Sequence, residues 1–126
     1  MREIKFRAIY RAEWVYGNFI KGLFKGVPFF QIENSDSEDF RQYQVDEEAV
    51  GQFTGLKDKN GKDIYEGDIV SSKGFEPKSY LIEFIEGGFC LTNKLVGIPI
   101  DVTHMEDSTG KHFEIIGNIH QNPELL

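Results

Sequence analysis

The stretch Phe53-Thr-Gly-Leu-Lys-Asp-Lys-Asn-Gly-Lys-Asp-Ile-Tyr-Glu-Gly-Asp-Ile-Val70 decides how this chain folds. Asn60-Gly61 is the dipeptide that best tolerates positive φ, so it predicts a two-residue hairpin turn. Ile64-Tyr65 predicts a brief extended segment, and Glu66-Gly67-Asp68 predicts a second turn. Ile69-Val70 then begins a strand, because β-branched residues favour extended backbone. A glycine turn that leads into a strand is typical of small curved barrels.

The same stretch also resembles a calcium-binding loop, since Asp58, Asn60 and Asp63 bring oxygen ligands close together in sequence. An EF-hand loop needs an acid five positions before its glycine and a bidentate Glu at its twelfth position. With Gly61 as that glycine, those positions hold Leu56 and Gly67. We therefore favour a structural turn and predict no metal site.

Alternating hydrophobicity predicts three strands before this stretch, at residues 3–10, 14–21 and 27–32. A turn at residues 11–13 joins the first two, and Gly17 marks a bulge or a close approach of another backbone. The third strand begins near a proline, which favours an edge position. The first strand places four residues on one face, and these form its predicted core side: Ile4, Phe6, Ala8 and Tyr10.

Residues 33–49 are strongly acidic, because they contain seven carboxylate side chains and a single basic residue, Arg41. Their polar composition predicts an acidic loop, with a short return strand near residues 40–45. Asp46 is placed to cap a single helical turn that runs through Ala49. The acidic residues are Glu33, Asp36, Glu38, Asp39, Asp46, Glu47 and Glu48.

Short strands and turns account for most of the remaining chain, so the predicted fold is mainly β, a small, partly open SH3-like barrel with an N-terminal β-hairpin unit. We expect a single domain over residues 1–126. Within it we expect an N-terminal β unit at 1–32, the acidic loop at 33–49 and a barrel-like part at 50–126. The later extended segments are predicted at residues 79–85, 89–92, 97–102 and 113–119.

Composition bounds the class of protein. The chain has 126 residues, 40% of them hydrophobic, which suits one folded domain rather than a disordered chain. No apolar run approaches the roughly 20 residues that span a bilayer, and the N-terminus lacks the apolar core of a signal peptide. Cys90 is the single cysteine, so no internal disulfide forms, and we expect it to be a small buried hydrophobe. A soluble cytoplasmic protein without a membrane partner is expected.

Motifs for catalysis and cofactor binding are missing from the sequence. It contains neither a Gly-rich phosphate loop nor a nucleophile elbow. His104, His112 and His120 are spaced by eight residues, which matches no zinc signature. We therefore predict no cofactor and no catalytic residue, which disfavours an enzyme while leaving one open.

Charge is unevenly distributed. The chain carries a net charge of −7, yet residues 1–25 hold six basic and two acidic side chains, a balance of +4, which leaves −11 for the rest. Aromatic residues interleave with basic ones in this N-terminal segment, a pattern that can stack bases and neutralise phosphates. The same pattern is typical of a core-facing strand pair with solvated basic residues, which we favour. The candidate contacts to nucleic acid or to a partner are Arg7, Arg11, Trp14 and Lys21.

Four blocks spread over the whole chain resemble the YopX family of phage and prophage proteins. They are Arg2–Ala8, Val50–Gly61, Ile64–Val70, and Ile115–Ile119 together with Asn122–Leu126. His120 and Gln121 depart from the family pattern, where an aromatic and an acid are usual. The resemblance implies a β-rich fold and a mobile-element setting in the host cytoplasm. It implies no mechanism and supplies no functional residues.

These observations leave several functions to weigh. The leading hypothesis is a non-enzymatic phage or prophage accessory protein that binds a macromolecule, namely a host or phage protein. The alternative is nucleic-acid binding through the basic aromatic N-terminal face. A third hypothesis has the acidic loop at residues 33–48 imitate nucleic acid toward a DNA-binding host protein. Self-association is left open.

Overall fold

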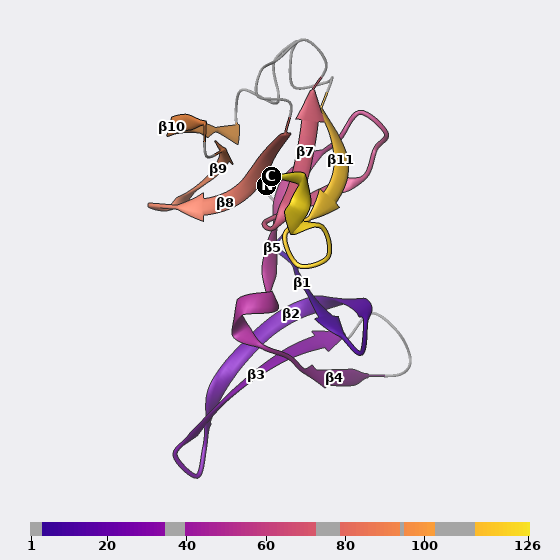
Figure 1. The fold of residues 1–126 in the computed structure, drawn as a ribbon. Helices are drawn as coiled ribbons and strands as arrows, with labels where there is room; N and C mark the ends of the chain where they lie inside the picture. Colours follow the sequence, from indigo (N-terminus) through magenta and orange to yellow (C-terminus); the bar gives the residue numbers. More distant parts are fainter. Residues whose placement is uncertain (1–3, 35–39, 73–78, 94, 103–112) are drawn as a thin grey trace. The chain divides into compact units, whose positions relative to one another are not determined.

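The computed structural model describes residues 4–34, 40–72, 79–93, 95–102 and 113–126, and these are mainly antiparallel β-strands (Figure 1). One sheet has the strand order β4-β3-β2-β1-β5-β6 and the other the order β10-β9-β8-β7-β11. The prediction of a mainly β fold is therefore confirmed. Neither sheet closes on itself among the described strands, which is compatible with a partly open barrel.

The chain divides into two compact units, residues 1–53 and residues 54–126, and the division falls inside β5. That these units act as one domain, as the sequence indicates, stays a prediction. The strands of the first unit are β1 (Phe6–Tyr10), β2 (Glu13–Phe24), β3 (Val27–Asn34), β4 (Arg41–Gln44) and the start of β5 (Gly51–Lys57).

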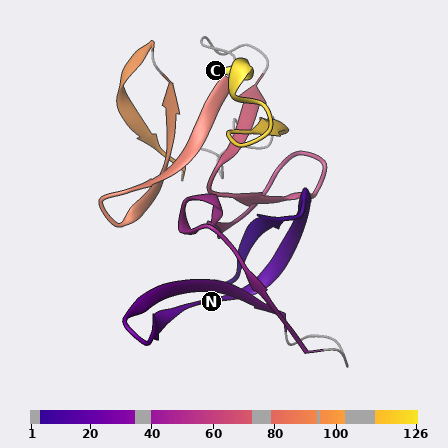
Figure 2. The ribbon, with the colours of Figure 1, turned by 60° about the horizontal axis from the view of Figure 1, so that its bottom comes forward.

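Two tight turns shape the first unit. Arg11 and Ala12 have φ of 51° and 69°, and Lys25 and Gly26 have φ of 52° and 79°. Two successive residues with positive φ define the hairpin turn whose twist matches that of the flanking strands. The predicted turn after the first strand is confirmed, and the second turn makes β2 and β3 one long hairpin (Figure 2).

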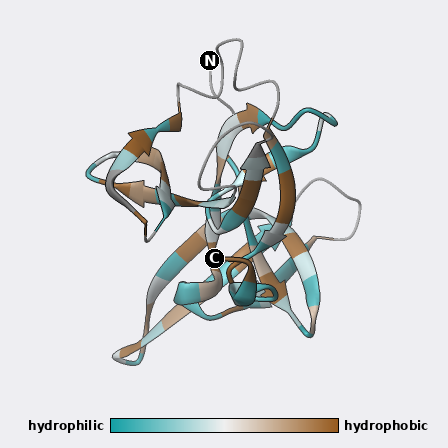
Figure 3. Cartoon of the chain, turned by 45° about the horizontal axis from the view of Figure 1, so that its top comes forward, coloured by the Kyte–Doolittle hydropathy of each residue, from teal (hydrophilic) through white to brown (hydrophobic). Residues whose placement is uncertain are grey.

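The predicted core side of β1 is confirmed in part. Ala8 is fully buried, as is Ile32 on β3, but Ile4 lies before β1 and is 67% exposed, and Arg7 on the opposite face is buried. The ring centroids of Phe6 and Phe19 lie 5.6 Å apart, and those of Phe19 and Phe30 lie 6.4 Å apart. One face of the hairpin thus carries a continuous aromatic layer. Figure 3 shows hydrophobic and hydrophilic residues alternating along these strands.

The sequence predicted either a bulge or a close approach of another backbone at Gly17, and the structure shows the close approach. Its φ is +154°, and a Cβ built there would overlap the carbonyl group of Glu33. Gly17 pairs with Phe6 of β1, and its neighbour Asn18 pairs with Glu33 of β3. A side chain at this position would therefore collide with backbone rather than with a flexible side chain.

Of two predictions about the middle of the chain, one is confirmed in part and one is wrong. The edge position predicted for the third strand holds at its proline-containing start, whereas β4 pairs with residues 31–34 of β3. The short return strand itself is confirmed, and the helical turn exists as a 3₁₀ turn at Glu47–Ala49. Asp46, however, makes no side-chain cap, since its exposed side chain leaves the turn to be closed by backbone hydrogen bonds such as that from Ala49 N–H to Asp46 O.

The second unit holds the remaining strands and the larger core. Ile64, Val70 and Ile82 are fully buried, and aromatic and aliphatic residues from the neighbouring strands surround them. The predicted extended segments after residue 70 are confirmed within the described residues. The strands are β6 (Asp63–Tyr65), β7 (Asp68–Ser72), β8 (Ser79–Ile85), β9 (Gly88–Asn93), β10 (Val96–Asp101) and β11 (Phe113–Asn118), with a 3₁₀ turn at Pro123–Leu125.

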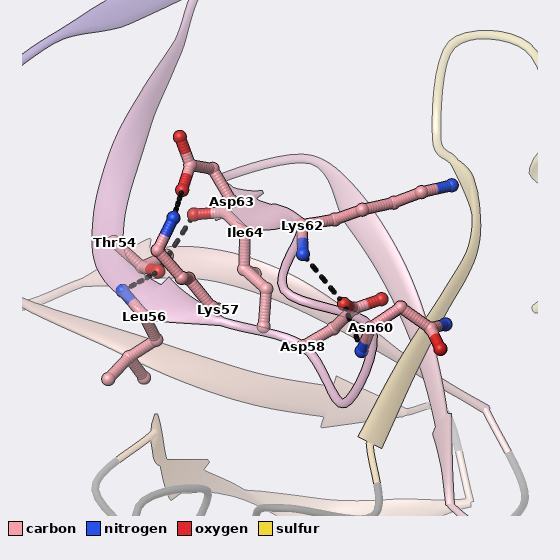
Figure 4. A network of polar contacts seen from close by, with 8 residues as sticks. All are labelled: Thr54, Leu56, Lys57, Asp58, Asn60, Lys62, Asp63 and Ile64. Carbon is pink, nitrogen blue, oxygen red and sulfur yellow. Dashed lines mark hydrogen bonds and ion pairs between the residues drawn. The ribbon is translucent and has the colours of Figure 1, made fainter.

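Asp58 organises the turn between β5 and β6 (Figure 4). Its Oδ1 accepts the backbone N–H groups of Asn60 and Lys62 at 2.8 and 2.9 Å, and its Oδ2 accepts that of Ile115 on β11 at 3.1 Å. Burial raises the pKa of Asp58, but the hydrogen bonds from Ile115, Lys62 and Asn60 outweigh burial and lower the pKa overall. The carboxylate therefore fixes the turn and joins it to β11.

The length of this turn differs from the prediction. Asp58 N–H donates to Lys62 O, so three residues rather than two lie between the bonded pair. Gly61 N–H donates to Asp58 O and Gly61 has φ of +82°, which is the turn plus left-handed residue expected of a three-residue loop. The following turn is confirmed, with Gly67 at φ +94° and Tyr65 N–H bound to Asp68 Oδ2 at 2.8 Å.

Candidate partner-binding site on the β2–β3 hairpin

The end of the β2–β3 hairpin presents apolar side chains to solvent. Leu23 is 71% exposed, Phe24 is 67% exposed and Val27 is 64% exposed. Because cross-strand partners share a face, Phe24 and Val27 lie together on one face, and Leu23 lies with Pro28 on the other. Both faces of the hairpin end are therefore apolar, and together these four residues form what we call the hairpin tip.

An open groove runs from the hairpin tip along the outer side of β3. It has a volume of about 820 Å³ and is lined by residues 24–31 other than Gly26, together with Gln44 and Val45. Its walls are mainly apolar, and Lys25 is the one charged residue among the described residues that line it. The Lys25 Nζ atom lies 5.6 Å from the centre of the Phe24 ring. We name this feature the β3-edge groove.

The structure separates the four candidate contacts that the sequence indicates. Arg7 is only 7% exposed, and its guanidinium lies 3.9 Å from the centre of the Trp14 ring. Arg11 lies in the exposed turn after β1, with its guanidinium 5.2 Å from the Tyr10 ring centre. Lys21 pairs with Phe30, on the face of β2 opposite to that of Trp14. Arg7 and Trp14 are thus brought together by packing, and nucleic-acid binding by the four residues stays a prediction.

Other features offer no alternative site among the residues that the structure describes. There, no three His, Cys, Asp or Glu side chains gather where they could hold a metal ion. Two of the three histidines of the sequence, His104 and His112, lie outside the described residues, and His120 is exposed. No described helix has the length and hydrophobicity needed to cross a membrane.

Cys90 is partly exposed, so its prediction as a buried hydrophobe is wrong. The alternation of β9 explains this, because Phe89 and Leu91 are the residues that point into the core. Burial raises the pKa of the Cys90 thiol, and the nearby carboxylates of Asp101, Glu83 and Glu86 raise it further.

We expect Cys90 to react slowly with iodoacetamide at pH 7.5. Its raised pKa leaves less thiolate than a free cysteine has, and the thiolate is the nucleophile. The alkylation rate of the folded protein should be several-fold below that of the urea-unfolded chain, and Glu83→Gln should increase it. A folded protein that reacts as fast as the unfolded chain would contradict the assignment.

The hairpin tip was not among the residues that the sequence indicated. A signal was present, since the two apolar pairs Leu23-Phe24 and Val27-Pro28 flank Lys25-Gly26. In a strand with one buried face, apolar and polar residues alternate, so consecutive apolar residues on both sides of a turn leave one of them exposed.

Comparisons with known proteins show which family and which solved structure this chain resembles. The family model described as "YopX protein" matches residues 5–126. The crystal structure of protein EF1440 from Enterococcus faecalis is similar over 100% of this chain and 99% of that one, with a TM-score of 0.58 and 24% identity. No curated protein matches the chain. The likeness to EF1440 supports the fold, and the family match over nearly the whole chain identifies it: the chain belongs to the YopX family.

Proposed function

We propose that this chain is a non-enzymatic, protein-binding accessory module of a phage or prophage that acts on a host or phage protein in the host cytoplasm. The observation that carries the proposal is the hairpin tip, where Leu23, Phe24 and Val27 are each more than 60% exposed. Contiguous apolar residues at a surface are costly to leave in water and mark sites of protein contact.

Three polar residues within the blocks that resemble the family serve the structure. Asp58 accepts three backbone N–H groups, Asp68 accepts the N–H of Tyr65, and the Thr54 hydroxyl donates to Ile64 O at 2.7 Å. These groups are occupied in holding turns. A binding function is therefore better sought in the first unit, where a mainly apolar groove with Lys25 at one end adjoins exposed apolar residues.

The test is a tagged copy of the chain expressed in host cells and recovered with and without nuclease treatment. We expect a specific protein to co-purify in both samples. Phe24→Ser should abolish its recovery by removing apolar contact area, while the protein keeps its fold because Phe24 is two-thirds exposed.

Leu95→Ser is the matched control, because Leu95 is 85% exposed on the second unit. It should leave recovery unchanged. Equal recovery with Phe24→Ser and the unchanged chain would contradict the proposal. Material lost on nuclease treatment would favour the nucleic-acid alternative, to be tested next with neutral replacements of Arg11 and Lys21.

A further inference from the structure

We infer that the β3-edge groove binds an extended peptide segment of a partner protein, apolar along its length and carrying a carboxylate at the end that lies near Lys25. The inference rests on the proposed protein-binding function and specifies the chemistry and the conformation of the bound segment. It is argued from the unpaired length of β3 and from the charges at the two ends of the groove.

Within the described chain, part of β3 has no strand on its outer side, the side away from β2. β4 pairs only with residues 31–34, and the last contact on that side is the bond from Val45 N–H to Phe30 O at 3.0 Å. Residues 27–29 therefore keep an open outer edge. At about 3.4 Å per residue this edge is long enough for roughly three residues of an added strand.

The alternation of hydrogen-bonded and non-hydrogen-bonded pairs along the hairpin shows which backbone groups of this edge are available to an added strand. Phe24 and Val27 flank the two-residue turn and exchange hydrogen bonds, so the next pair, Leu23 and Pro28, does not. The carbonyl of Pro28 is thus directed outward, as is that of Phe30, which accepts the bond from Val45. An added segment would donate an N–H to Pro28 O and place its side chains against Val27, Pro28 and Phe29.

Charge determines which segment fits. Residues 19–32 contain Lys21 and Lys25 and no carboxylate, in a chain whose net charge is −7. Lys25 lies at the tip end of the groove, whereas the exposed Asp46 and Glu47 follow Val45 at the other end. A carboxylate is therefore attracted at the tip end and repelled at the far end, so an acidic residue is favoured at one end of the bound segment only.

A second copy of the chain fits the groove less well. Antiparallel pairing of two β3 edges would bring Pro28 of each copy to the interface, where proline supplies no N–H. A proline at this position is typical of an edge protected against self-association and leaves a foreign segment as the occupant.

The test uses a random octapeptide library selected on the full-length protein. We expect enrichment of β-branched and aromatic residues, with Asp or Glu concentrated at one end. Lys25→Glu should shift that end to Lys or Arg, and it should weaken an enriched acidic peptide about ten-fold or more, because the charge contact becomes repulsive. Lys57→Glu, on the second unit, is the control and should change neither.

A second measurement tests the extended conformation. Methylating alternate backbone nitrogens of an enriched peptide removes the N–H groups that would bind Pro28 O, so one of the two alternating sets should abolish binding. Enrichment of basic peptides, no enrichment, or binding unaffected by Lys25→Glu or by both methylation sets would overturn the inference. A concentration-dependent dimer that an enriched peptide dissociates would overturn it in favour of a second copy.

These failures are distinguishable from failure of the proposed function. If a partner is recovered through Phe24 while the peptides do not bind, the hairpin tip binds a folded surface and only the inference about the groove is lost. If neither recovery of the partner nor binding of the peptides depends on the hairpin, both the proposed function and the inference about the groove are wrong.

Discussion

Asp58→Ala should destabilise the second unit by on the order of 3 kcal/mol, because three backbone N–H groups lose a charged acceptor at once. Those groups belong to Asn60, Lys62 and Ile115, so the change loosens both the turn and its attachment to β11. Urea unfolding measures the loss of stability. Amide hydrogen exchange at Lys62 and Ile115 should show where it occurs.

Asp63→Ala is the matched control, since Asp63 lies in the same turn region and pairs with Lys57 at 2.8 Å on the surface. Exposed ion pairs contribute about 0–1 kcal/mol, so this variant should unfold close to the unchanged chain. Equal unfolding of the Asp58 and Asp63 variants would contradict the role assigned to Asp58.

The Asp58 contribution should also depend on pH. The pKa of Asp58 is lower in the folded chain than in the unfolded one, so the unfolded state takes up the proton first as the pH falls. The stabilisation is therefore complete above the ordinary carboxyl pKa of about 3.9 and is lost as the pH falls through the lower folded value. The stability difference between Asp58→Ala and the unchanged chain should narrow in that acid range.

The sequence predicted the strands well because their signals are local. Alternation placed Ala8 on the buried face of β1, and the Gly67 turn followed from its own residues. The turn at Asn60-Gly61 was predicted one residue too short, because the length of a loop depends on which residues bond across it. Here the bond from Asp58 N–H to Lys62 O decides it, and no local pattern shows that bond.

The predictions about binding residues were less accurate because those residues depend on contacts between strands. A basic side chain on a strand is expected to point to solvent, yet Arg7 is buried against Trp14. That burial depends on the pairing of β1 with β2, which brings Arg7 opposite Tyr16 and so places Trp14, two residues along β2, on the same face. The groove beside β3 likewise arises because β4 pairs only with residues 31–34, a property of the sheet rather than of any one segment.

Gly17→Ala should destabilise the first unit by about 3 kcal/mol or more, the sum of backbone strain and a steric clash. The φ of +154° is one that residues with a Cβ rarely adopt, and the added Cβ would overlap the Glu33 carbonyl. Relief requires β2 and β3 to separate at this point, because the obstacle is backbone. We expect faster amide exchange at Asn18 and Glu33, measured by NMR, and a lower unfolding midpoint in urea.

Gly88→Ala is the control for this last variant. The position begins β9, and a Cβ there meets nothing within 4 Å, so Ala should change stability by no more than about 1 kcal/mol and should favour folding through the unfolded state. Equal stability of the two variants would mean that β2 and β3 tolerate a side chain at Gly17. If only Gly17→Ala is destabilised and peptide binding falls with it, the long hairpin must be held by this close approach for the β3-edge groove to form.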